Sequence, residues 1–213
     1  MSNNDTIALE TAEFLLQIKA IKLDNNNPFT WSSGIKSPIY CDNRKILSYP
    51  KIRTYIRQEF TKLIREEFGE LDLIAGVATG AIAHGVLVAQ ELGLPFAYVR
   101  SSKKEHGLTN QIEGVVESGQ SVVVIEDLVS TGQSSLAAVH ALREAGCNVK
   151  GMVAIFTYGL ESAAKNFKEE NVSLYTLTDY DHLIKYALDM KYIKEADKLS
   201  LVRWRENPEG WGK

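Results

Sequence analysis

Apolar residues recur every three or four positions after Pro50, and this spacing predicts an amphipathic helix over residues 50–68. They are Ile52, Tyr55, Ile56, Phe60, Leu63, Ile64 and Phe68. Beyond this helix, short apolar runs alternate with longer segments of helical pattern. The apolar runs predict strands at residues 71–78, 95–100, 121–127, 149–158 and 172–178. The intervening segments predict helices at residues 81–93, 134–146, 161–171 and 181–190. This alternation predicts an α/β fold with a parallel sheet flanked by helices on both faces.

The two ends of the chain lack this alternation. A first helix is predicted from Asp5 or Thr6, either of which can serve as its N-cap, to about Leu23. Residues 24–44 mix turn residues with short aromatic and apolar runs, which predicts small irregular strands and turns. The tail, residues 206–213, is expected to be frayed.

Composition narrows the class of protein. With 213 residues, 45% of them hydrophobic, the chain is long enough to bury a core, and its net charge of -3 argues against binding to nucleic acid. Its two cysteines, Cys41 and Cys147, form no CxxC or Cys/His cluster, so we expect no disulfide framework and no zinc site. No apolar run approaches the roughly 18 residues that span a bilayer, and the polar start is not a signal peptide. We therefore expect a cytoplasmic protein without membrane contact.

The candidate chemistry lies in "VVVIEDLVSTGQSS", residues 122–135, where a buried strand runs into Glu126 and Asp127. Ligands of α/β sheets bind at the carboxyl ends of the strands, and the small residues before the next helix can direct several N–H groups at one anion. The acids would repel a phosphate, so they should face sugar hydroxyls or a magnesium-bearing region. A ligand with a phosphate, a cis-diol and a metal-bound leaving group fits all three. The alternative, in which the acids end a strand and Ser134 caps a helix, explains the serine alone.

Neither GxxxxGK[ST] nor GxGxxG occurs in the chain. Four apolar residues, two acids, an apolar residue and a Thr-Gly loop instead resemble the phosphoribosyl pyrophosphate signature of the type I phosphoribosyltransferases. The resemblance implies that residues 130–134, here called the phosphate loop, bind the 5-phosphate and that the two acids bind the ribose hydroxyls. The residues implied to bind phosphoribosyl pyrophosphate here are Glu126, Asp127, Leu128, Val129, Ser130, Thr131, Gly132, Gln133 and Ser134.

A basic segment, "YVRSSKKEHG" at residues 98–107, is here called the lid. Taken alone it can be a solvated loop, but it resembles the catalytic loop of orotate phosphoribosyltransferases. That resemblance implies that Arg100, Lys104 and His106 reach the pyrophosphate, with Lys103 a further contact, and that Lys104, His106 and Asp127 are catalytic. It also implies a homodimer in which the lid closes over the neighbouring subunit's site.

The segment "FTWSSGIKSPIYCDNR", residues 29–44, resembles the part of the orotate branch that covers the base. The resemblance implies one domain over 1–213, with a hood formed by about 1–48 plus a C-terminal segment, and a core of about 49–180. Ser32, Gly80 and Ser101 stand where many members carry lysine, so hood N–H groups and the Ser130 hydroxyl become the candidates for holding orotate. The turn at residues 76–80 is interpreted equally as a pyrophosphate contact or as a structural turn.

The activity implied by the resemblance is transfer of the 5-phosphoribosyl group from phosphoribosyl pyrophosphate to orotate, giving orotidine 5-monophosphate and pyrophosphate in pyrimidine (UMP) biosynthesis. Magnesium would be the cofactor, carried mainly by the substrate rather than by protein ligands. Two alternatives remain at this point: a transferase for another base, such as a purine, and a phosphoribosyl pyrophosphate-sensing regulator. The regulator would need a basic surface or an added DNA-binding domain, and the sequence contains neither.

Overall fold

A six-stranded sheet organises the computed structural model, which describes residues 3–31, 34–100 and 111–211. The strand order is β10-β9-β8-β5-β6-β7. Its strands are β5 (Leu73–Val77), β6 (Phe96–Val99), β7 (Ile112–Glu113), β8 (Ser121–Val129), β9 (Asn148–Thr157) and β10 (Leu174–Asp179). Five strands are parallel, whereas β7 pairs antiparallel with β6. The predicted α/β fold is confirmed, and the antiparallel edge strand lies in a region predicted only as a polar loop.

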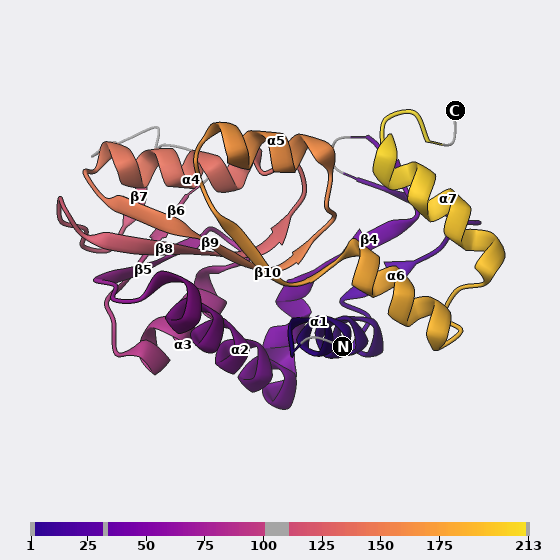
Figure 1. The fold of residues 1–213 in the computed structure, drawn as a ribbon, viewed down its shortest axis with the longest axis horizontal. Coiled ribbons are helices and arrows are strands. Elements are labelled where there is room, and N and C mark those ends of the chain that lie inside the picture. Colours follow the sequence, from indigo (N-terminus) through magenta and orange to yellow (C-terminus); the bar gives the residue numbers. More distant parts are fainter. Residues whose placement is uncertain (1–2, 32–33, 101–110, 212–213) are drawn as a thin grey trace.

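Helices cover both faces of this sheet (Figure 1). On one side lie α4 (Gln133–Glu144) and α5 (Glu161–Glu169), and on the other lie α2 (Pro50–Phe68) and α3 (Ile82–Leu92). Side chains of β8 alternate between the two layers: Val122 and Val124 pack in the core beside α4, and Val123 and Ile125 in the core beside α2. Burial on both faces explains why this strand is a continuous apolar run.

The first helix departs from the prediction at both of its ends. Helix α1 is Asn3–Gln17, so it begins before Asp5 and ends well before Leu23. Lys19 adopts a left-handed conformation with φ of 54°, which ends the helical course. The chain then forms β1 (Ile21–Leu23), which pairs with β4 (Ile39–Cys41), so long-range pairing overrides the local helical pattern. Strands β2 (Phe29–Thr30) and β3 (Lys36–Ser37) form a second small pair, and η1 (Asn43–Ser48) leads into α2.

The C-terminal region is more ordered than predicted. After α6 (Tyr180–Asp189), a further helix, α7 (Glu195–Glu206), packs Trp204 into the core with no exposed surface. Trp211 donates its indole N–H to the Ser200 hydroxyl at 3.2 Å. The expectation of a frayed tail is therefore wrong through Trp211. Within the described ranges, no helix combines the length and apolar character needed to cross a membrane.

Candidate active site

A cleft of about 410 Å³ opens at the carboxyl ends of β5 and β8. Its walls come from the segment after β4, the turn after β5, the end of β8 and the first turn of α4. The lining residues are Cys41, Asp42, Arg44, Val77, Ala78, Thr79, Gly80, Glu126, Asp127, Leu128 and Ser134. A larger cleft of about 960 Å³ lies between Lys36 of β3 and α7, away from the strand ends. We take the smaller cleft as the candidate site because it contains the paired acids at the edge where α/β sheets bind ligands.

The two acids belong to strand β8 itself, which continues to Val129 rather than ending at Asp127 as predicted. Glu126 is 4% exposed, and both of its carboxylate oxygens accept protein hydrogen bonds. Its Oε1 accepts from the Asp127 backbone N–H at 2.9 Å, and its Oε2 accepts from the Ser135 hydroxyl at 2.8 Å. Burial and the neighbouring Asp127 charge hold the pKa of Glu126 well above its usual range. Glu126 is thus engaged within the protein.

Asp127 faces the turn after β5. A Cβ placed on Gly80 would lie 2.3 Å from the Asp127 Oδ2, so the carboxylate occupies the space that a side chain at position 80 would need. Burial raises the pKa of Asp127, while its interactions with Glu126 and Arg44 oppose that shift. A glycine at position 80 therefore has a steric reason.

The segment after β4 brings two further groups to the acids, and neither was assigned a role from the sequence. Asn43 donates its side-chain N–H to the Asp127 carbonyl oxygen at 2.6 Å. Arg44 pairs its Nε with Asp42 Oδ1 at 2.6 Å and also contributes positive charge near Asp127. The sequence offers no local signal for these contacts, since Asn43 and Asp127 are 84 residues apart.

The phosphate loop connects β8 to α4. Gly132 is the N-cap of α4 with φ of 80°, and a Cβ there would lie 2.6 Å from the Phe167 ring, so both backbone and space require glycine. The Leu136 N–H bonds to the Gly132 carbonyl at 2.8 Å as the helix begins. The preceding N–H groups of the first turn have no acceptor within the helix, as an anion site needs.

The predicted phosphoribosyl pyrophosphate contacts differ in their surroundings. Leu128 and Ser134 line the cleft, whereas the Val129 side chain is fully buried. Ser130, the candidate for orotate, is half-buried in the phosphate loop with Thr131.

Arg100 directly follows β6, and its guanidinium pairs with the Glu113 carboxylate of β7 at 3.5 Å. Arg100 is not among the described residues that line the cleft. Lys103, Lys104 and His106 lie outside the described residues, as do Ser32 and Ser101.

Comparison with known proteins identifies the family to which the chain belongs. Residues 43–177 match the model of the phosphoribosyl transferase domain. An orotate phosphoribosyltransferase of Porphyromonas gingivalis is 57% identical over 208 residues, which cover 97% of this chain and 99% of that protein. Another from Listeria innocua is 55% identical and covers 98% of this chain and 100% of its own length.

Solved structures agree with this fold. The crystal structure of orotate phosphoribosyltransferase from Aeropyrum pernix superposes with a TM-score of 0.74 at 26% identity, covering 86% of this chain and 99% of that one. UMP synthase of Leishmania donovani superposes with a TM-score of 0.75 at 28% identity, covering 92% of this chain but 42% of that longer one.

Proposed function

The chain belongs to the orotate phosphoribosyltransferases, which join orotate to phosphoribosyl pyrophosphate in UMP biosynthesis and release pyrophosphate, and we propose that this transfer takes place in the cleft beside Asp127. One observation carries the proposal: the fold brings the paired acids, the turn after β5 and the first turn of α4 into one cleft. These are the groups needed for a ribose, a pyrophosphate and a 5-phosphate.

Within this cleft we assign different tasks to neighbouring residues. The N–H groups of the phosphate loop receive the 5-phosphate, which the helix N-terminus favours. Asp127 faces the ribose and the anomeric carbon, while Glu126, already bonded to Ser135, holds the shape of the strand end. The barrier is cleavage of the C1–O bond, because the orotate ring nitrogen is readily anionic and needs no strong base. A carboxylate near C1 stabilises the positive charge that develops on the sugar.

The lid supplies the opposite charge. Arg100, Lys103, Lys104 and His106 are proposed to stabilise the negative charge that grows on pyrophosphate as it departs. Orotate is proposed to be held by N–H groups of the hood and by the Ser130 hydroxyl. The Arg100–Glu113 pair supports a role for Arg100 at the base of the lid, because it anchors the point where the lid leaves the sheet.

Magnesium fits the donor set of this cleft. Asp42 and Asp127 both line it, and Mg²⁺ prefers oxygen ligands supplied by one or two carboxylates together with substrate phosphates. Such an ion would neutralise charge on the pyrophosphate. In the described part of the chain, no three His, Cys, Asp or Glu side chains gather as a metal site.

We further propose one domain with a hood at about 1–48 plus a C-terminal segment, and a core at about 49–180. The family match over residues 43–177 supports this division. We also propose a cytoplasmic homodimer that shares its lids. Free thiols at Cys41 and Cys147 suit a reducing compartment. The lid follows β6, the strand next to the edge strand β7, and from there it is proposed to reach a neighbouring subunit.

The test is pyrophosphate release from phosphoribosyl pyrophosphate and magnesium with orotate, adenine, guanine or uracil. Activity with orotate alone is expected, and Asp127→Asn should lower kcat by about 100-fold or more with little change in Tm. Asp72→Asn is the matched control, because Asp72 contacts the opposite end of β8 by accepting the Ser121 N–H at 2.8 Å. Equal kcat for the two variants would remove Asp127 from the site, and preference for a purine would reject orotate as the base.

A further inference from the structure

Two asparagine side chains outside the predicted ligand contacts each bond to one backbone carbonyl of the strand and loop that form the site. Asn43 bonds to the Asp127 carbonyl, and Asn166 of α5 bonds to the Thr131 carbonyl at 2.9 Å. We propose that both are positioning residues of the transfer reaction, Asn43 for the sugar-facing acid and Asn166 for the phosphate loop. The proposal rests on the proposed function of the cleft and assigns residues that act through its ligand contacts.

Asn43 contacts β8 beyond the point where β5 stops pairing with it. Strand β5 pairs with β8 only as far as Gly76 and Ile125, so the end of β8 extends past its neighbour on that side. There the Asn43 amide, 1% exposed, donates to the Asp127 carbonyl at 2.6 Å. A side-chain donor thus bonds the strand end that β5 leaves behind, and fixes the peptide from which the Asp127 side chain projects.

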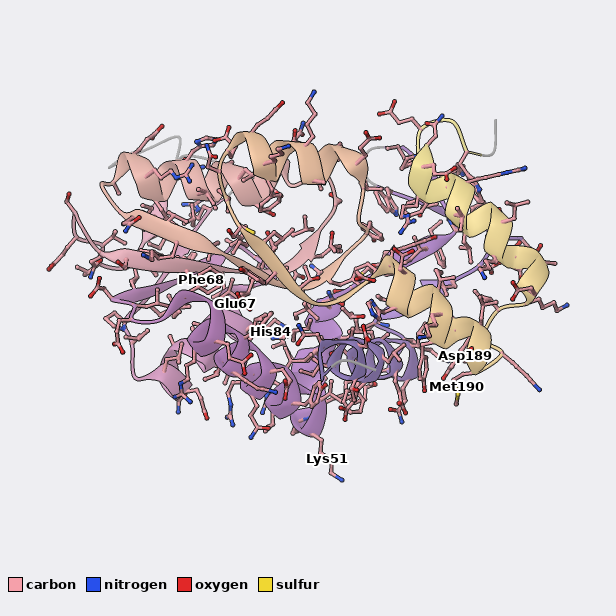
Figure 2. All side chains as sticks on the ribbon, viewed as in Figure 1. Lys51, Glu67, Phe68, His84, Asp189 and Met190 are labelled. Carbon is pink, nitrogen blue, oxygen red and sulfur yellow. The ribbon has the colours of Figure 1, made fainter. Side chains whose placement is uncertain are left out.

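Asn43 is itself held on several sides. Its Oδ1 accepts a hydrogen bond from the Cys41 thiol at 3.3 Å. The Asn43 backbone also interacts with the ring of His84 in α3, which is labelled in Figure 2, and this interaction opposes the lowering of the His84 pKa by burial. Asn43 therefore connects β4, α3 and β8 at one buried point. A side chain constrained in this way transmits the position of the hood to the acid.

Asn166 orients the phosphate loop through peptide geometry. In a planar trans peptide, the C=O and the following N–H point in opposite directions. The Asn166 amide holds the Thr131 carbonyl toward α5, so the Gly132 N–H points away from α5 and becomes available to an anion. The next residue of α5, Phe167, packs where a Gly132 side chain would lie, so α5 sets both the direction and the tightness of the loop.

The two variants should have different kinetic effects. Asn43→Ala should lower kcat by about 10- to 100-fold with less than about a threefold change in the KM for phosphoribosyl pyrophosphate, because displacement of Asp127 affects the reacting carbon. Asn166→Ala should raise that KM about tenfold and leave kcat within about threefold, because the 5-phosphate is bound equally before and during the reaction.

Asn25→Ala is the matched control. Asn25 also donates its amide to a distant backbone carbonyl, that of Asp197, at 3.2 Å, but it does not line the candidate cleft. Because Asn25 lies in the hood segment, the comparison is made at saturating orotate, where Asn25→Ala should keep the wild-type kcat and the wild-type KM for phosphoribosyl pyrophosphate. Asn43→Ser is measured beside Asn43→Ala, as a less disruptive polar change, and the folded fraction of every variant is followed by thermal melting and circular dichroism.

Two results would overturn the proposal. The first is that the Asn43 variants and Asn166→Ala have the same kcat and KM as Asn25→Ala, once each value is corrected for the fraction of folded protein. The other is an equal change of kcat and KM in Asn43→Ala and in Asn166→Ala, which indicates general loosening. Asp127→Asn measured in parallel separates this failure from that of the site: if Asp127→Asn is inactive while the Asn43 and Asn166 variants are normal, only the positioning role is wrong.

Discussion

At the scale of single residues, two adjacent acids of the same strand have different surroundings. Both carboxylate oxygens of Glu126 accept hydrogen bonds from the protein, one from the Ser135 hydroxyl and one from the Asp127 N–H. The carboxylate of Asp127 instead lies against Gly80 at the edge of the cleft. Both acids line one cleft, but protein donors occupy the oxygens of Glu126, so one acid stabilises the site and the other is left to face the ligand.

Gly80 should be coupled to Asp127. Gly80→Ala forces the carboxylate to move, so we expect lower kcat and a loss of stability in the wild-type background. In an Asp127→Ala background the obstructing atoms are gone and the stability cost should largely vanish, giving a coupling energy of about 0.5–3 kcal/mol in a double-mutant cycle. Urea unfolding of the four proteins measures it, and an equal cost in both backgrounds would place the clash elsewhere.

His84 should make the protein sensitive to acid. Burial of this side chain, 2% exposed, lowers its pKa from 6.5 to about 4. Between pH 4 and pH 6.5 the unfolded chain binds more protons at this position than the folded chain does. The contribution of His84 to the free energy of unfolding is therefore fully present above pH 6.5 and falls by about 3 kcal/mol as the pH drops toward 4.

His84→Gln should flatten this dependence of the free energy of unfolding in urea titrations at pH 4.5, 5.5 and 7. His140→Gln, at an exposed position, is the control. The same acid slope in wild type and His84→Gln would assign the loss of stability to other groups.

At the scale of elements, aromatic rings join the C-terminal helix to the hood. Trp204 of α7 lies 5.6 Å, between ring centroids, from Trp31, from Tyr158 after β9 and from Tyr180 of α6. Tyr158 in turn lies near enough to Cys41 and Asp127 for their charges to add to the effect of burial in raising its pKa. Helix α7 thus packs against Trp31 of the hood, and this contact supports the proposal that a C-terminal segment belongs to the hood.

Trp204→Ala should cost about 3–5 kcal/mol, because it leaves a large cavity among fixed rings. We also expect a higher KM for orotate, since Trp31 loses its support. Leu199→Ala, on the same helix but 59% exposed, is the control and should change stability by no more than about 0.5 kcal/mol. Similar urea midpoints for the two variants would show that α7 does not support the hood.

At the scale of the whole molecule, the lid and the paired acids belong to different strands of the sheet. The lid follows β6, the acids lie near the carboxyl end of β8, and β5 lies between these two strands. The lid is proposed to serve a neighbouring subunit, whereas the phosphate loop connects β8 to α4 of its own chain.

Mixed dimers test this arrangement. Lys104→Ala protein and Asp127→Asn protein, re-associated at random, should form about half hybrids, each with one intact site, so activity should rise to about a quarter of wild type. Subunit exchange is verified by native mass spectrometry. Activity that stays at the average of the two parents despite complete exchange would mean that each lid serves its own chain.

The sequence alone determined the alternation of the five parallel strands with helices between Pro50 and about residue 190, the α/β class and the location of the paired acids. Each of these depends on local information: hydrophobic period, turn residues and a contiguous motif. The family resemblance extended this to the orotate branch, and the relatives confirm it.

Only the tertiary structure decided where α1 ends, that β7 joins the sheet, that α7 exists and buries Trp204, and that Asn43, Gly80 and Asn166 contact the site. These features depend on pairing between segments far apart in the chain. A strand of two residues such as β7 has no period of its own, and an asparagine carries no sign of which carbonyl it will meet. Their partners are set by how the layers pack, because a buried carbonyl left without a donor is costly and the fold must supply one.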